Sequence, residues 1–206
     1  MNQITLSENV MVSDPCYSPD TWCQTKLNNV LPGLYNVEVD KSDLDGWGTR
    51  VSSITVIHED YEDTDDWEQH SECGVDSGQC GIFCMTGYRN DELSVGITTP
   101  PLDNPFVLPY NDKGGDMWYE KMCQFTLGKE QFGLYDTGVV SSSGIGDGLY
   151  PMDVMMDGDK IVGIRLDYLG NSDEDLLDEG DVCGVCGGEL EPDGECVYCC
   201  DEKTED

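Results

Sequence analysis

Basic residues are scarce in this chain. Its 206 residues include ten Lys or Arg against 43 Asp or Glu, which gives a formal net charge of −33. Binding to nucleic acid phosphates or to an anionic membrane requires clustered Lys and Arg. The sequence therefore argues against direct nucleic acid binding and against membrane attachment. The charge fits solubility alone, or attraction to a basic partner, including a DNA-binding protein for which the chain is an acidic decoy.

Long apolar runs are also missing. No stretch approaches the length of a transmembrane helix. Residues 1–12 lack the basic region and following apolar run of a signal peptide. We therefore expect a cytoplasmic location, where the eleven cysteines stay reduced rather than forming a disulfide scaffold.

Histidine is limited to His58 and His70, and no nucleophile-elbow pattern occurs. A Ser-His-Asp triad is therefore disfavoured. The acids, bases and nucleophiles that remain are His58, Asp76, Ser143 and Asp147. The sequence favours a protein without catalytic activity and leaves a metal-dependent or Ser/Asp hydrolase open as an alternative.

The apolar residues of the first 170 positions recur mostly with the alternation of strands. Asp157-Gly158 between two apolar runs is a strong hairpin signal. The predicted fold class is α+β, predominantly antiparallel β with two short helices, plus a C-terminal zinc-ribbon-like knuckle. The expected strands cover residues 3–6, 10–13, 34–39, 50–58, 81–85, 149–156 and 161–169.

Two segments have helical spacing. Ser18-Pro19-Asp20 is typical of a helix start, and the apolar positions from Trp22 to Val30 repeat as on a helix that ends at Pro32. A second helix is expected over 118–125. The acidic segment 59–72 and the proline-rich segment 98–115 are interpreted as loops.

The composition changes sharply after Gly170. We predict a β-rich body over residues 1–170, an acidic linker over 171–181, and a zinc-ribbon-like segment with an acidic tail over 182–206.

Four cysteines of this last segment stand in two CxxC knuckles. Four thiolates arranged tetrahedrally select zinc, and a segment so short depends on the metal for its folding energy. The run also resembles the short zinc ribbons, although Cys200 stands where they have glycine, so Cys200 competes with Cys199 as the fourth ligand. The predicted structural zinc ligands are Cys183, Cys186, Cys196 and Cys199. A redox role for the knuckles is the rival interpretation.

The remaining cysteines lack such order. Cys73, Cys80 and Cys84 could hold a second metal together with His70, or they could be buried free thiols.

Two glycine-containing segments resemble each other, residues 74–78 and 141–151. Glycine permits tight turns with positive φ, and Asp147 can cap exposed amides there. A phosphate loop would need a helix N-terminus or an adjacent lysine, and neither is present. The candidate binding residues are Asp76, Ser77, Ser143, Gly144, Asp147 and Tyr150. Tight-turn chemistry without any ligand is the alternative.

Residues 10–169 resemble the domain of unknown function 4241 family, found in bacteria and phages. The resemblance implies no established activity, and the zinc-ribbon-like segment lies outside it. It depends on the following ordered motifs: Asp14-Pro15, Pro32-Gly33-Leu34-Tyr35-Asn36-Val37, Arg50-Val51, Gly74-Val75-Asp76-Ser77-Gly78, Ser143-Gly144-Ile145-Gly146-Asp147-Gly148-Leu149-Tyr150-Pro151 and Ile164-Arg165-Leu166-Asp167-Tyr168.

Together these patterns favour a non-enzymatic binding or accessory protein of bacterial or phage type, stabilised by one structural zinc. Its partner would be a protein or a small-molecule ligand, and its location would be the host cytoplasm if a phage encodes it. The hydrolase and the acidic decoy are the alternatives.

Overall fold

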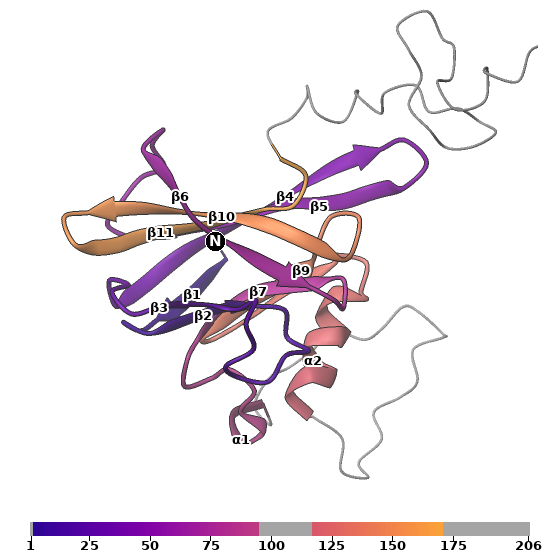
Figure 1. Ribbon diagram of the computed structural model, residues 1–206, viewed down its shortest axis with the longest axis horizontal. Coiled ribbons are helices and arrows are strands. Elements are labelled where there is room, and N and C mark those ends of the chain that lie inside the picture. Colours follow the sequence, from indigo (N-terminus) through magenta and orange to yellow (C-terminus); the bar gives the residue numbers. More distant parts are fainter. Residues whose placement is uncertain (1, 95–116, 171–206) are drawn as a thin grey trace, which may run out of the picture. The chain divides into compact units, whose positions relative to one another are not determined.

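The computed structural model describes residues 2–94 and 117–170 of the chain. These residues form two sheets of antiparallel strands, and a short helix packs on one of them (Figure 1). In this part of the chain no helix has the length and apolar character needed to cross a membrane. The predicted loop 98–115, the linker 171–181 and the zinc-ribbon-like segment 182–206 lie outside the described residues.

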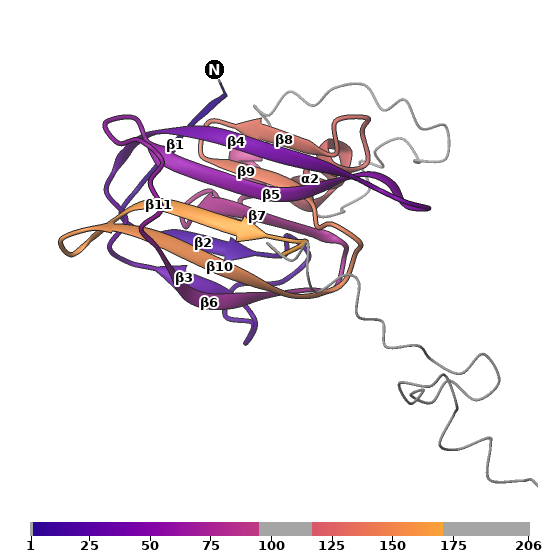
Figure 2. The same ribbon diagram turned by 90° about the horizontal axis from the view of Figure 1, so that it is seen from above.

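The larger sheet has six strands, and Figure 2 looks onto them. The predicted hairpin at Asp157-Gly158 is confirmed, and Gly158 has the positive φ of 61° that such a turn requires. The order of the strands is β1 (Gln3–Leu6), β4 (Gly33–Leu44), β5 (Gly48–His58), β11 (Lys160–Asp167), β10 (Gly148–Asp157) and β6 (Trp67–Val75).

The smaller sheet has five strands. Its central strand, β7, is buried along its whole length, because one face meets the larger sheet and the other meets the helix. The order of the strands is β3 (Thr25–Leu27), β2 (Val10–Ser13), β7 (Gln79–Cys84), β9 (Gly138–Ser142) and β8 (Phe132–Tyr135).

The main core lies between the two sheets, which makes the described body a β-sandwich. Ile54 and Val56 of β5 and Ile164 of β11 point inward from the larger sheet. Val12 and Ile82 point inward from the smaller one. This alternation of apolar residues is the pattern from which the strands were predicted.

A second core lies on the other face of the smaller sheet, under α2 (Met117–Thr126). Trp118, Met122 and Phe125 are the buried apolar residues of this helix, and Phe83 lies beneath them. The second predicted helix is thus confirmed. The single turn α1 (Asp91–Ser94) contributes Asp91, whose carboxylate accepts a hydrogen bond from the Trp118 N–H at 2.8 Å.

The first predicted helix is wrong. Residues 18–24 form turns, and the chain then enters β3. Asp20 has a positive φ of 73°, which no α-helix accommodates. The Gln24 side chain accepts a hydrogen bond from the Thr21 N–H and donates one to the Tyr88 hydroxyl. Hydrogen bonds to a distant part of the fold therefore override the local helical spacing.

The acidic segment 59–72 is a loop only in its first half, because β6 begins at Trp67. Arg165 of β11 lies 4.5 Å from the Trp67 ring centroid and forms an ion pair with Asp153 at 2.8 Å. The indole N–H of Trp67 also donates to Asp63. Strand β6 is an edge strand, where charged side chains are common because they discourage further pairing.

The edges of the two sheets contact each other on both sides of the sandwich. The Thr5 N–H of β1 donates to the Asp136 carbonyl oxygen at 2.8 Å, next to β8 and β9. On the other side the Gly74 N–H of β6 donates to the Cys23 carbonyl oxygen at 3.1 Å. These bonds cover polar backbone groups that a free edge would expose.

Candidate functional site

Two glycine-containing turns lie side by side at one end of the sandwich. One joins β6 to β7 and contains Asp76, Ser77 and Gly78, and the other joins β9 to β10 between Ser143 and Asp147. The Gly78 N–H donates to Asp147 Oδ1 at 3.0 Å, and the Ser143 N–H donates to the Gly78 carbonyl oxygen at 3.0 Å. The structure thus brings the candidate residues of both segments together.

Glycine is required in these turns by the backbone conformation. Gly78 and Gly146 have φ values of 66° and 128°, in the region that favours glycine. Gly144 has a φ of 51°, and a Cβ atom there would lie 3.0 Å from the Tyr168 Cβ atom. The similarity of the two sequence segments therefore reflects turn geometry at least in part.

Asp14, which is not among the binding residues predicted from the sequence, organises the first turn. Its side chain is fully buried. Oδ1 accepts hydrogen bonds from the Cys16 N–H and the Ser77 hydroxyl, both at 2.7 Å. Oδ2 accepts from the Asp76 N–H at 2.9 Å and from the Ser77 N–H at 2.7 Å. The only sequence signal was the Asp-Pro pair at the end of a strand, because an Asp side chain there readily caps nearby amides.

The second turn is held by Ser143 and Tyr150, which are both buried. The Ser143 hydroxyl donates to the Gly146 carbonyl oxygen at 2.8 Å, and the Tyr150 hydroxyl lies 2.7 Å from the same oxygen. Burial raises the pKa of Tyr150 above its ordinary value. The hydroxyl groups of Ser77, Ser143 and Tyr150 are thus used within the turns.

The exposed side chains of the two turns are a mixture of apolar and acidic groups. Ile145 is 53% exposed and Leu149, at the start of β10, is 58% exposed. Asp76 and Asp147 are also exposed. We call these four residues the turn surface.

Trp22 lies in the loop that borders this surface and is 86% exposed. Its neighbour Cys23 packs on Gly74, which is the register partner of Leu149. A Cβ atom on Gly74 would lie 2.7 Å from the Cys23 Cβ atom and 3.6 Å from Leu149 Cδ2. The missing side chain of Gly74 therefore lets the Trp22 loop approach the turn surface.

His58 does not belong to this site. His58 follows Ile57, which lies at the same level of the larger sheet as Met155, near the end of β10, because both residues pair with Gly163 of β11. The turn surface instead adjoins Gly148, at the start of β10. At about 3.3 Å per residue along β10, the level of Met155 and the level of Gly148 are roughly 20 Å apart. The His58 ring is buried, and its Nδ1 accepts a hydrogen bond from the Asp60 N–H. The hydrolase set of His58, Asp76, Ser143 and Asp147 is therefore not assembled.

The Cys16 thiol, next to Asp14, does not fit a nucleophile. Burial and a hydrogen bond with Asp14 raise the pKa of the Cys16 thiol to about 12. Because the thiolate is the reactive species, a raised pKa lowers the reactivity of this side chain at neutral pH.

The four residues considered for a second metal do not converge. The Cys73 and Cys80 sulfur atoms lie 3.2 Å apart. Cys84, further along β7, accepts a hydrogen bond from the Ser7 N–H and donates one to the Thr5 carbonyl oxygen. Over residues 2–94 and 117–170, no three His, Cys, Asp or Glu side chains are placed to hold a metal ion. The predicted zinc ligands Cys183, Cys186, Cys196 and Cys199 lie outside the described residues.

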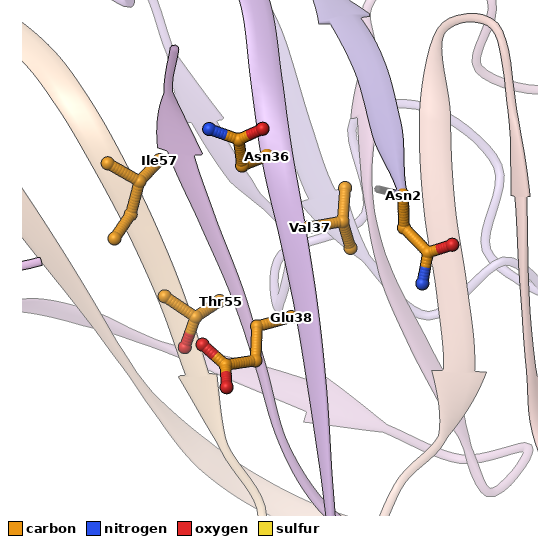
Figure 3. Close-up of a pocket in the computed structure, with 6 residues that line it drawn as sticks. All are labelled: Asn2, Asn36, Val37, Glu38, Thr55 and Ile57. Carbon is orange, nitrogen blue, oxygen red and sulfur yellow. The ribbon is translucent and has the colours of Figure 1, made fainter. Parts of the chain in front are cut away.

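A depression of about 330 Å³ lies over β4 and β5, away from the turns (Figure 3). Figure 3 shows Glu38 beside Thr55 and the amide of Asn36 further along β4. Glu38 is the one ionisable side chain in its lining. The depression therefore lacks the converging polar groups of a catalytic or ligand site. Its lining consists of Asn2, Asn36, Val37, Glu38, Thr55 and Ile57.

The chain was compared with protein-family models, curated proteins and solved structures. None of the three comparisons gives a match. The resemblance to the domain of unknown function 4241 family therefore stays an expectation based on the ordered motifs.

Proposed function

We propose that this chain is a non-enzymatic binding protein that docks a basic protein segment on its turn surface. The proposal depends on one observation. Ile145 in the second turn and Leu149 at the start of β10 are more than half exposed, and the polar groups of the two turns hydrogen-bond to one another. The resemblance to the 4241 family supports an accessory role of bacterial or phage type by analogy only.

The internal hydrogen bonds favour binding because they fix the turns before a partner arrives. Asp14 and Tyr150 anchor the two turns to buried positions. A surface that is already ordered loses less conformational entropy on association. Apolar side chains presented by such a surface and surrounded by polar groups are typical of protein–protein contacts.

The charge of the chain selects the partner. Asp76 and Asp147 are the exposed acidic residues of the same two turns, and the net charge of the whole chain is −33. A partner segment that carries Lys or Arg beside an apolar side chain complements both features. The same charges accelerate the encounter at low ionic strength.

The test begins with capture on the immobilised full-length chain from a bacterial lysate, followed by identification of the bound protein and its purification. We then compare the affinity of that protein for the wild type and for Ile145→Ser/Leu149→Ser. We expect at least a roughly tenfold loss for the double variant, the size found for central interface residues. Added salt should weaken wild-type binding, because it screens exposed charges.

Leu34→Ser is the matched control. Leu34 is also an exposed leucine, but it precedes Tyr35, the register partner of His58, at the other end of the sheet. This variant should bind like the wild type. The proposal is wrong if the double variant keeps wild-type affinity for every captured protein, or if Leu34→Ser weakens binding as much.

We further propose that one zinc ion holds residues 182–206 through Cys183, Cys186, Cys196 and Cys199. Protein purified under reducing conditions should release one zinc per chain on denaturation. The double substitution Cys183→Ser/Cys196→Ser should abolish this release, whereas Cys123→Ser in α2 should not. Cys199→Ser and Cys200→Ser, measured separately, identify the fourth ligand. A wild-type protein without zinc would contradict the proposal.

A further inference from the structure

Two buried thiols face each other across the main core. Cys73 lies on β6 of the larger sheet and Cys80 on β7 of the smaller sheet. Both are fully buried, and their sulfur atoms are 3.2 Å apart. Cys73 is the register partner of Tyr150 and Cys80 that of Ser141, so the pair lies directly behind the two turns.

We propose that Cys73 and Cys80 form an oxidation site whose disulfide joins the two sheets. A disulfide needs two sulfur atoms that can approach to about 2 Å. Here only a short movement of side chains separates the contact from the bond. The cross-link would fix β6 to β7 on the core side of the turn at Gly78.

The reaction is a thiol–disulfide exchange with a low-molecular-weight disulfide such as oxidised glutathione. One cysteine thiolate attacks the small disulfide, forms a mixed disulfide and releases one small thiol. The second cysteine thiolate then displaces the other small thiol and closes the protein disulfide. The two protons lost by the cysteines are taken up by the two released thiols. The protein loses two electrons, and the small disulfide gains them.

The surroundings of the pair favour a bond between Cys73 and Cys80 over a bond from either of them to another nearby thiol. Cys84 is occupied by its hydrogen bonds to the backbone of Ser7 and Thr5. Cys23 packs on Gly74 with its sulfur 3.3 Å from the position of an added Cβ atom. A metal is not the better explanation within the described ranges, because no third ligand side chain joins the two sulfur atoms.

Burial determines when the exchange can happen. Burial and a hydrogen bond with Cys73 raise the pKa of Cys80, so little of the Cys80 thiolate exists in the closed sandwich. Small disulfides also have no access to residues with no exposed surface. The bond should therefore form during folding, or when β6 and β7 move apart at the turn that joins the two sheets, and should afterwards resist reduction.

The test is refolding of the full-length chain from denaturant in oxidised glutathione, followed by alkylation of free thiols. A protease that cleaves before Asp76 then separates Cys73 from Cys80, so the two peptides stay together only through a disulfide. We expect the Cys73–Cys80 peptide pair in most molecules, together with a higher midpoint of thermal unfolding that falls again after reduction of the denatured chain and refolding.

Two variants test the specificity. Cys73→Ala should eliminate the linked peptide and the rise of the midpoint. Cys123→Ser, which removes a partly exposed thiol of α2, should leave the linked peptide and the rise of the midpoint unchanged. The proposal is overturned if Cys73 and Cys80 are recovered alkylated, bound to glutathione or paired with other cysteines. Cys80 and Cys84 share the peptide 76–90, so fragmentation of the linked pair between these two residues assigns the bond. Because the wild-type peptides decide this, the test does not depend on whether Cys73→Ala folds.

Discussion

The buried carboxylate of Asp14 concentrates more hydrogen bonds than any candidate residue chosen from the sequence. Four donors from Cys16, Asp76 and Ser77 converge on its two oxygen atoms. A buried carboxylate is costly to desolvate, so its retention depends on this full set of donors. Removal of the side chain would leave the donors without their partner.

We expect Asp14→Ala to lower the free energy of unfolding by roughly 3 kcal/mol, because four hydrogen-bond donors lose a buried carboxylate acceptor. The measurement is urea denaturation at neutral pH. Asp147→Ala is the control, because this exposed carboxylate accepts a hydrogen bond from the Gly78 N–H and its loss should cost about 1 kcal/mol or less. Equal losses in the two variants would contradict the role assigned to Asp14.

At the scale of elements, the packing of α2 on β8 depends on the absence of a side chain at Gly133. A Cβ atom there would lie 1.8 Å from Phe125 Cδ1 and 2.6 Å from the Phe125 Cβ atom. Phe125 is buried, so neither the ring nor the helix can move away without disturbing the second core. We expect Gly133→Ala to destabilise the protein by about 1–3 kcal/mol, the usual cost of overpacking.

Gly128→Ala gives the comparison for this helix. Its added carbon would lie 3.5 Å from the carbonyl oxygens of Gln124 and Phe125, an ordinary contact. The midpoint of thermal unfolding should therefore stay close to that of the wild type, while Gly133→Ala lowers it. If both variants unfold at the wild-type temperature, α2 does not pack on β8 as described.

The elements that could be predicted are those whose signals are local. The β10–β11 hairpin has its Asp-Gly turn, and α2 has apolar residues at helical spacing. Strands β8 and β9 were missed because their apolar runs are short and β9 pairs with β7, which lies far away in the sequence. The role of Asp14 was missed for the same reason, since its partners Asp76 and Ser77 are more than sixty residues away.

At the scale of the whole molecule, burial of many ionisable hydroxyl and thiol groups makes the stability of the fold sensitive to alkaline pH. Burial raises the pKa of Tyr35, Tyr88 and Tyr168 above their ordinary value, and that of Cys16 to about 12. In the folded protein these groups stay protonated at a pH where the unfolded chain has already ionised them. Their effect on stability should therefore appear only on the alkaline side.

The sign follows from proton linkage. Between the ordinary pKa values, about 8.5 for Cys and 10 for Tyr, and the raised values, the folded state holds more protons than the unfolded state, so the free energy of unfolding falls as pH rises. Below this pH window these groups do not make the free energy of unfolding depend on pH. Denaturant midpoints should thus be independent of these groups near about pH 8 and fall steeply from about pH 10, with tyrosinate absorbance rising together with unfolding. Tyr88→Phe should reduce the steepness, because one buried hydroxyl no longer ionises on unfolding. If the tyrosinate signal that Tyr88→Phe removes instead forms gradually while the protein stays folded, Tyr88 is not enclosed as the second core requires.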